Sequence, residues 1–317
     1  MTVGGRFGAV LTAMATPFDV AGRLDVAGAA ELARWLVSQG NDGLVVAGTT
    51  GESPTLSDEE KVALWRAVAT AVDVPVVAGT STYDTVHSVR LTEAAVAAGA
   101  AGILAVTPYY NRPSQAGIEQ HFRAVAAAAG GRPVLVYDIP VRTGRRVEPA
   151  TLLRLGREGV IAGVKDATGD PAGAAALIAD APTGFELYSG NDGDTLALLA
   201  VGAVGTVSVE GHWATPEVAE MIAAFGKGDV SHARAVNAGL IPSHRYQSSE
   251  EAPNPVPTKA MLRVLGLPGG ACRPPMGPEP EGLAEQAWAV LAGLGRPAVP
   301  AGRPAPAPAE PDRARLG

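Results

Sequence analysis

Ile161-Ala162-Gly163-Val164-Lys165 is a short apolar run that ends in a lysine, and the turn sequence Asp166-Ala167-Thr168-Gly169 follows it directly. After the turn, residues 172–179 carry apolar side chains at helical spacing. This order predicts a strand–helix unit whose strand is covered on both faces. Lys165 would then lie at the carboxyl end of a buried strand.

The same unit recurs along the first two thirds of the chain. Further apolar runs occur at residues 9–14, 43–46, 76–78, 102–106, 134–137, 186–189 and 205–209. Helical patterns separate them at residues 26–38, 58–71, 85–98, 116–129, 149–157, 172–179 and 194–201. Repeated alternation of this kind predicts an α/β fold, a closed (β/α)8 TIM barrel, better than an open doubly wound sheet. Gly48-Thr49-Thr50-Gly51 also lacks the spacing of a dinucleotide- or phosphate-binding loop.

We expect three regions along the chain: a barrel catalytic domain over residues 1–214, a C-terminal helical extension over 215–295, and a disordered Pro/Ala-rich tail over 296–317. After Pro216 the sequence shows no convincing strand, only helical patterns at residues 217–225, 230–240, 257–265 and 282–291. The tail carries six prolines between Pro297 and Pro311. Such a segment buries too little apolar surface to offset its ordering entropy.

Composition and charge argue against several classes of binding partner. The net charge of −7 and the absence of a dense basic cluster, apart from Arg142, Arg145 and Arg146, argue against nucleic acid. The N-terminus lacks an export signal and no stretch of about 20 residues is uniformly apolar, so we expect a cytoplasmic protein without membrane contact. The single cysteine and five scattered histidines predict no disulfide, no metal and no other cofactor.

Lys165 has two interpretations. As a rim residue it would be solvated and paired with Asp166. As a desolvated amine its pKa would fall far enough for attack on a carbonyl group. The choice depends on its neighbours, because residues that directly follow barrel strands meet at one mouth.

Other strand ends carry reactive or anion-binding side chains. Gly48-Thr49-Thr50-Gly51-Glu52-Ser53 offers hydroxyls and backbone N–H groups to a carboxylate, or is simply a turn that caps the next helix. Tyr109 and Tyr110, in the segment 107–113, either take part in the reaction or only pack against neighbouring side chains. Tyr137 precedes Arg142 by five positions, which suits a proton relay beside an anion clamp. For Ser189-Gly190-Asn191-Asp192 we favour a helix cap. Together these ends predict a Schiff-base lyase that acts on a small anionic substrate.

The segments 48–53, 107–113, 137–144 and 164–169 closely resemble the dihydrodipicolinate synthase family, from about Gly8 to about Leu291. The wider superfamily of pyruvate-dependent class I aldolases, including N-acetylneuraminate lyase, shares the lysine and tyrosine but usually not the Arg142 context or the double threonine. The resemblance implies a lyase of lysine and diaminopimelate biosynthesis that condenses pyruvate with L-aspartate 4-semialdehyde, giving 4-hydroxy-tetrahydrodipicolinate. Another pyruvate-dependent 2-keto acid aldolase or dehydratase is the alternative.

The resemblance also implies roles for individual residues. Lys165 would form the imine with pyruvate, and Tyr137 would relay protons together with Thr49 and with Tyr110 from a neighbouring subunit of a homotetramer, a dimer of dimers. The implied substrate-binding residues are Thr50, for the pyruvate carboxylate, Arg142, for the semialdehyde carboxylate, and the pocket-lining positions Gly190 and Val207. No metal is implied.

Two features depart from the family pattern. His87 stands where a carboxylate would contact lysine in feedback-regulated members, so we expect weak or absent inhibition by lysine. The segment 250–255 resembles a Pro-Asn-Pro stretch of the family, but the preceding residues 244–249 are less typical.

Overall fold

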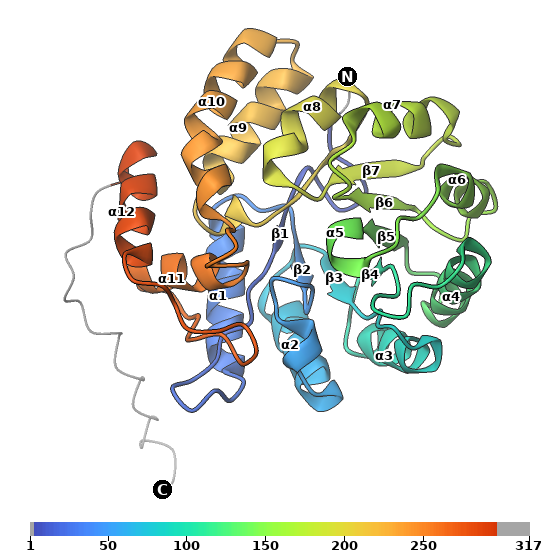
Figure 1. The fold of residues 1–317 in the computed structure, drawn as a ribbon, viewed down its shortest axis with the longest axis horizontal. Coiled ribbons are helices and arrows are strands. Elements are labelled where there is room, and N and C mark those ends of the chain that lie inside the picture. Colours follow the sequence, from blue (N-terminus) through green and yellow to red (C-terminus); the bar gives the residue numbers. More distant parts are fainter. Residues whose placement is uncertain (1–2, 297–317) are drawn as a thin grey trace, which may run out of the picture.

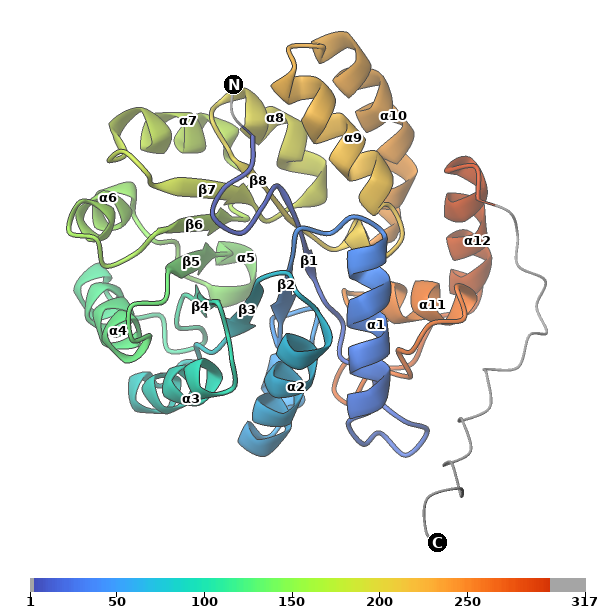
Figure 2. The same cartoon turned by 180° about the vertical axis from the view of Figure 1, so that it is seen from behind.

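The computed structural model describes residues 3–296 and shows a closed barrel of eight parallel strands, β1 to β8 in chain order. The strands are β1 (Val10–Ala13), β2 (Gly43–Val46), β3 (Val76–Gly79), β4 (Gly102–Val106), β5 (Val134–Asp138), β6 (Gly163–Asp166), β7 (Glu186–Ser189) and β8 (Gly205–Ser208). β8 pairs with β1 and closes the ring. The predicted TIM barrel is confirmed, and Figures 1 and 2 show helices surrounding the strands.

Helices follow the strands, and all of them except the short α5, which lies at the carboxyl ends of the strands, surround the barrel. They are α1 (Val26–Ser38), α2 (Asp58–Ala71), α3 (Thr85–Ala97), α4 (Gln115–Ala128), α5 (Pro140–Thr143), α6 (Pro149–Arg157), α7 (Pro171–Asp180), α8 (Thr195–Ala200) and α9 (Thr215–Gly226). Because α9 follows β8, it completes the strand–helix alternation. We therefore propose to count α9 with the barrel, which moves the domain boundary beyond residue 214.

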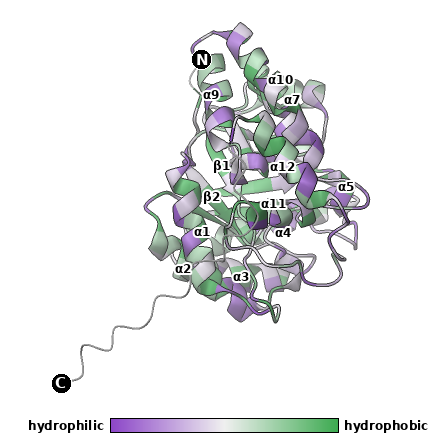
Figure 3. Ribbon diagram, turned by 90° about the vertical axis from the view of Figure 1, so that its left-hand side faces the viewer, coloured by the Kyte–Doolittle hydropathy of each residue, from purple (hydrophilic) through white to green (hydrophobic). Residues whose placement is uncertain are grey.

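Two layers of apolar side chains hold the barrel together. Inside the ring, Leu11, Val45, Leu104 and Leu135 pack in one cluster, while a larger cluster fills the space between strands and helices. Every strand position is buried or nearly so, which explains why the strands read as continuous apolar runs. Figure 3 shows the hydrophobic residues gathered on the strands and the hydrophilic ones mostly on outer helix faces and loops.

The start of β6 needs glycine for a steric reason. A Cβ atom on Gly163 would lie 1.9 Å from the Glu186 carbonyl oxygen on the neighbouring strand. Only a residue without a side chain lets β6 and β7 approach closely at this point. The glycine thereby sets the register in which Lys165 stands two residues further along β6.

The C-terminal extension packs on the barrel beside α1. It consists of α10 (Val230–Tyr246), α11 (Val256–Val264) and α12 (Leu283–Gly293). Leu262 of α11 belongs to the cluster between strands and helices, and both ribbon views place α11 next to α1. α10 continues through Pro242 to Tyr246 and is longer than the predicted 230–240. Except for Arg296, the predicted disordered tail lies outside the described residues.

Within residues 3–296, no helix combines the length and apolar character that crossing a membrane requires.

Candidate active site

A cavity of about 330 Å³ opens at the carboxyl ends of the strands. Its walls include most residues that the sequence singles out, namely Thr49, Thr50, Tyr137, Arg142, Lys165 and Gly190. A second cavity of about 240 Å³ adjoins it and shares Thr49, Tyr137 and Arg142. The strand ends therefore bring the predicted amine, phenol, hydroxyls and guanidinium to one place.

Lys165 and Tyr137 stand side by side on adjacent strands. The register pairs Tyr137 of β5 with Lys165 of β6, so both side chains leave the sheet at the same level. The Nζ atom of Lys165 lies 4.0 Å from the centroid of the Tyr137 ring. Lys165 is only 5% exposed, which excludes the solvated rim pair with Asp166.

Burial changes the acid–base properties of both side chains. It lowers the pKa of Lys165 to about 8, although Asp192 opposes this effect and Arg142 adds to it. Burial raises the pKa of Tyr137 to about 12, against the effects of Arg142 and of a hydrogen bond to Thr49. At neutral pH a useful fraction of the amine is uncharged while the phenol keeps its proton. A nucleophile thus lies beside a proton donor.

The loop after β2 carries the two threonines. Thr49 lines both cavities, and Thr50 is 3% exposed, with its Oγ1 atom 3.0 Å from the donating Nδ2 atom of Asn254. The loop does not cap the next helix, because Ser57 caps α2 with a capping box. The two threonine hydroxyls therefore do not serve as caps of α2.

Glu52 anchors the end of this loop to the C-terminal extension. Its backbone is left-handed (φ 54°), and its side chain is buried. Lys259 of α11 places Nζ 2.5 Å from Oε1 of Glu52, and the backbone N–H of Arg273 donates to Oε2 at 2.8 Å. No local sequence pattern indicates this pair, because 207 positions separate Glu52 from Lys259.

Arg142 lies in the short helix α5. Pro140 begins the helix and Gly144, with φ 70°, ends it, so one turn carries the guanidinium over the mouth of the cavity. The side chain is exposed and lines both cavities. It can meet an incoming anion before that anion reaches Lys165.

Two buried acidic residues follow β7 and β8: Asp192, which lines the cavity, and Glu210, which contacts Asp192 but does not line the cavity. Their sequence pattern did not indicate a role in the site. Asp192 is 4% exposed, and its Oδ2 atom accepts hydrogen bonds from the backbone N–H groups of Val209 (2.8 Å) and Glu210 (3.2 Å). Glu210 accepts a hydrogen bond from His244 (3.1 Å), and burial together with Asp192 raises the pKa of Glu210 to about 7. The favoured capping role is wrong here, since Asn191 and Asp194 make no side-chain cap to the helices they precede.

Gly190 and Val207 occupy different levels of the barrel. A Cβ atom on Gly190 would come within 2.9 Å of the Asp166 carbonyl oxygen and of the Ala167 side chain, so only glycine leaves this wall open. Val207 is 1% exposed and packs in the interior cluster with Leu11. Val209, two residues later, lines the cavity.

Tyr110 points away from the cavity of its own chain. Its side chain is 92% exposed and its backbone is left-handed (φ 70°), a conformation that is uncommon for an aromatic residue. The preceding Tyr109 packs edge-on against Tyr83, with 5.5 Å between ring centroids, and lines the smaller cavity. Within residues 3–296, the tyrosine whose ring lies beside the Lys165 amine is Tyr137.

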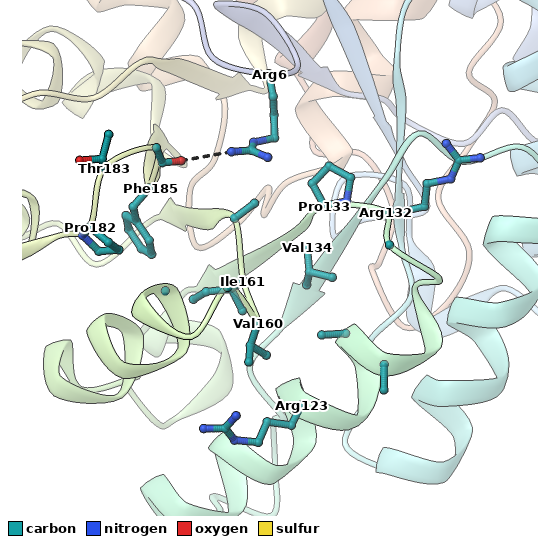
Figure 4. A pocket seen from close by; sticks show the side chains of 17 residues that line it. Arg6, Arg123, Arg132, Pro133, Val134, Val160, Ile161, Pro182, Thr183 and Phe185 are labelled. Carbon is teal, nitrogen blue, oxygen red and sulfur yellow. Dashed lines mark hydrogen bonds between the residues drawn. The ribbon is translucent and has the colours of Figure 1, made fainter.

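A larger hollow of about 680 Å³ lies at the opposite, amino-terminal end of the strands, where β5 begins (Figure 4). Two of its three arginines, Arg6 and Arg123, already have partners. Arg6 binds Glu186 and donates to the Gly184 carbonyl (3.1 Å), and Arg123 binds Glu119 and Glu158. This hollow lacks a nucleophile of the kind found at the carboxyl ends.

The geometry suits imine chemistry on a small carbonyl compound that carries a carboxylate. The amine and phenol supply nucleophile and proton carrier, while Thr50 and Arg142 supply two anion contacts. Across residues 3–296, no group of three or more histidine, cysteine, aspartate or glutamate side chains is arranged to hold a metal ion.

The chain matches known proteins over nearly its whole length. The model of the "Dihydrodipicolinate synthetase family" matches residues 6–292. A 4-hydroxy-tetrahydrodipicolinate synthase from Moorella thermoacetica is 49% identical over 273 residues, which cover 86% of this chain and 92% of the relative.

Solved structures agree with the sequence comparison. A dihydrodipicolinate synthase from Bacillus anthracis superimposes with a TM-score of 0.87 at 41% identity and covers 91% of this chain and 98% of its own. The enzyme from Cyanidioschyzon merolae, solved with lysine bound, gives 0.88 at 36% identity, with coverages of 92% and 99%.

Proposed function

Because the chain belongs to the dihydrodipicolinate synthetase family, we propose that it condenses pyruvate with L-aspartate 4-semialdehyde through an imine on Lys165. The product is 4-hydroxy-tetrahydrodipicolinate, and the reaction serves lysine and diaminopimelate biosynthesis. The protein is a class I aldolase-type lyase. The observation that carries this assignment is the buried Lys165 amine, 4.0 Å from the ring of Tyr137, in the same cavity as Thr50 and Arg142.

The first half of the reaction activates pyruvate. The neutral Nζ atom of Lys165 attacks the keto carbon, and the keto oxygen leaves as water after protonation. Tyr137 lies close enough to carry these protons, and Thr49 lines the same cavity. Thr50 holds the carboxylate. Loss of a methyl proton then gives the enamine.

The second half forms the new carbon–carbon bond. The enamine carbon attacks the aldehyde, whose oxygen takes up a proton. The amino group of the former semialdehyde then displaces Lys165 from the imine and closes the ring, so the free lysine is regenerated. Arg142 at the mouth binds the semialdehyde carboxylate and orients this substrate.

We also propose that Tyr110 completes the proton relay of a neighbouring subunit in a homotetramer. Its support is the exposed, backbone-strained position of Tyr110 outside its own cavity. A cytoplasmic location is part of the same proposal, because the small anionic substrates and the single cysteine suit that compartment.

The decisive experiment combines intact mass and turnover. The protein is incubated with pyruvate and borohydride, and the adduct is mapped, while turnover is followed with aspartate semialdehyde. An adduct on Lys165 together with semialdehyde turnover is the expected result. An adduct without turnover would identify a different pyruvate-dependent aldolase, and no adduct would refute the imine mechanism.

A further inference from the structure

The segment after α10 reaches back to the cavity through Asn254. Asn254 lines the cavity, is 8% exposed, and stands two residues before the start of α11. Its Oδ1 atom accepts a hydrogen bond from Oγ1 of Thr258 at 3.0 Å. Its Nδ2 atom therefore faces the other way and donates to Oγ1 of Thr50 at 3.0 Å.

This order of donors fixes the direction of the Thr50 hydroxyl. A hydroxyl has one proton, and here its oxygen already accepts from the Asn254 amide. Thr50 makes no other side-chain hydrogen bond within residues 3–296, so its proton remains available to a ligand in the cavity. Successive hydrogen bonds in a buried chain also polarise one another, which makes the last donor stronger.

We propose that Asn254 is a positioning residue that turns the Thr50 hydroxyl toward the pyruvate carboxylate. The inference rests on the proposed function, in which Thr50 binds that carboxylate. The chain of hydrogen bonds runs from Thr258 on α11 through Asn254 to Thr50 and ends at the substrate. The C-terminal extension is thereby part of the substrate site.

The surroundings keep the chain rigid. Thr258 is fully buried in α11, and the next residue of that helix, Lys259, forms the ion pair with Glu52 two residues after Thr50. On the other side of the loop, the Thr16 hydroxyl donates to the Gly51 carbonyl at 2.6 Å. Thr50 therefore sits in a loop held from both sides, and a change at Asn254 acts mainly on the direction of its proton.

The test compares Asn254→Asp with Asn254→Ala. Aspartate has the shape of asparagine but offers an acceptor where the amide donates, so Thr50 must turn its proton away from the substrate. Alanine removes the amide and leaves Thr50 free to rotate. A purely structural role predicts the larger loss for alanine, whereas the positioning role predicts the larger loss for aspartate.

The readout is imine formation on Lys165, trapped by borohydride at increasing concentrations of pyruvate or of its neutral methyl ester. We expect Asn254→Asp to weaken apparent pyruvate binding about ten-fold or more, the effect of losing a hydrogen bond to a charged group. Binding of methyl pyruvate should change far less, and Asn254→Ala should lie between this variant and the unmodified protein. The same Asn→Asp change at Asn237 on α10, outside the cavity wall, is the matched control.

Two results would overturn the proposal: equal loss for pyruvate and its ester, or unchanged pyruvate binding in Asn254→Asp. The second would mean that the amide is not a donor to Thr50. If Thr258→Ser keeps the preference for pyruvate over methyl pyruvate and Thr258→Val loses it, the result supports the complete hydrogen-bond chain from Thr258 through Asn254 to Thr50. If the unmodified protein forms no adduct with pyruvate, the proposed function fails instead, and the two failures are distinguishable.

Discussion

Imine formation should follow the deprotonation of Lys165, and pH is the perturbation that tests it. Burial lowers the pKa of this lysine from the ordinary 10.5 to about 8, a difference equivalent to about 3 kcal/mol. At pH 7 roughly 9% of the amine is then neutral, compared with roughly 0.03% for an unperturbed lysine, an advantage of about 300-fold.

The lowered pKa gives the pH dependence a definite sign. The rate of pyruvate imine formation should rise about ten-fold per pH unit below about pH 7, reach half its maximum near pH 8 and level off above about pH 9. Tyr137 should not contribute to this rise, because its pKa is raised to about 12 and it stays protonated throughout the range.

Two variants should move the midpoint in opposite directions. Asp192→Asn removes a charge that raises the pKa of Lys165, so the midpoint should fall, and Arg142→Ala removes a charge that lowers it, so the midpoint should rise. Glu210, whose pKa is raised to about 7, is the control, because Glu210→Gln should leave a midpoint near 8 if Lys165 is the titrating group.

The assay is borohydride trapping at short, fixed times across pH 6 to 10, read by intact mass. A midpoint near that of a solvated lysine would refute the argument from burial. So would shifts of the same sign in Asp192→Asn and Arg142→Ala, because local charge would then not control the amine.

Further predictions concern the second substrate, regulation and the loop anchor. Arg142→Ala should lower turnover with the semialdehyde by roughly 10- to 100-fold, the effect of losing a hydrogen bond to a charged group, while the pyruvate adduct still forms; loss of the adduct as well would contradict the assigned role. Lysine should inhibit weakly or not at all, because His87 occupies the position where a regulated enzyme would present a carboxylate to the lysine amine. The His87 ring already binds Asp58 at 2.8 Å. A low-millimolar inhibition constant for lysine would contradict this prediction. Glu52→Gln should reduce the free energy of unfolding by about 3–5 kcal/mol in chemical denaturation, since the ammonium of Lys259 stays buried without its partner. Adding Lys259→Met should recover part of that loss, and a double variant no more stable than Glu52→Gln would argue against an unpaired charge as the cause.

The barrel could be predicted because its determinants are local. Each strand is a short apolar run bounded by turn residues, and the predicted bounds of residues 43–46, 102–106 and 186–189 match β2, β4 and β7. Parallel strands in a closed ring also place their carboxyl ends together, so Lys165 and Tyr137 could be expected to meet without any coordinates. The short helix α5 was missed because a four-residue turn of helix has no periodicity to detect.

The parts of the site that escaped prediction depend on contacts between distant segments. Asp192 and His244 line the cavity and both contact Glu210, yet no local pattern connects the turn after β7, the turn after β8 and the last turn of α10. The segment 250–255 was noticed in the sequence, but its purpose depends on where α11 packs.

Packing of α11 converts a structural extension into part of the reaction site. The helix buries Leu262 against the barrel, and this contact brings Lys259 to Glu52 and Asn254 to Thr50. Apolar burial thus supplies the stabilising free energy, while the polar contacts hold the loop after β2 and, in the proposed hydrogen-bond chain, set the direction of the Thr50 hydroxyl proton. A TIM barrel leaves such loops to be held by whatever packs over the carboxyl ends of its strands. In the proposed function, recognition of the pyruvate carboxylate therefore depends on Asn254, outside the barrel, as well as on the strand ends that carry the amine and the phenol.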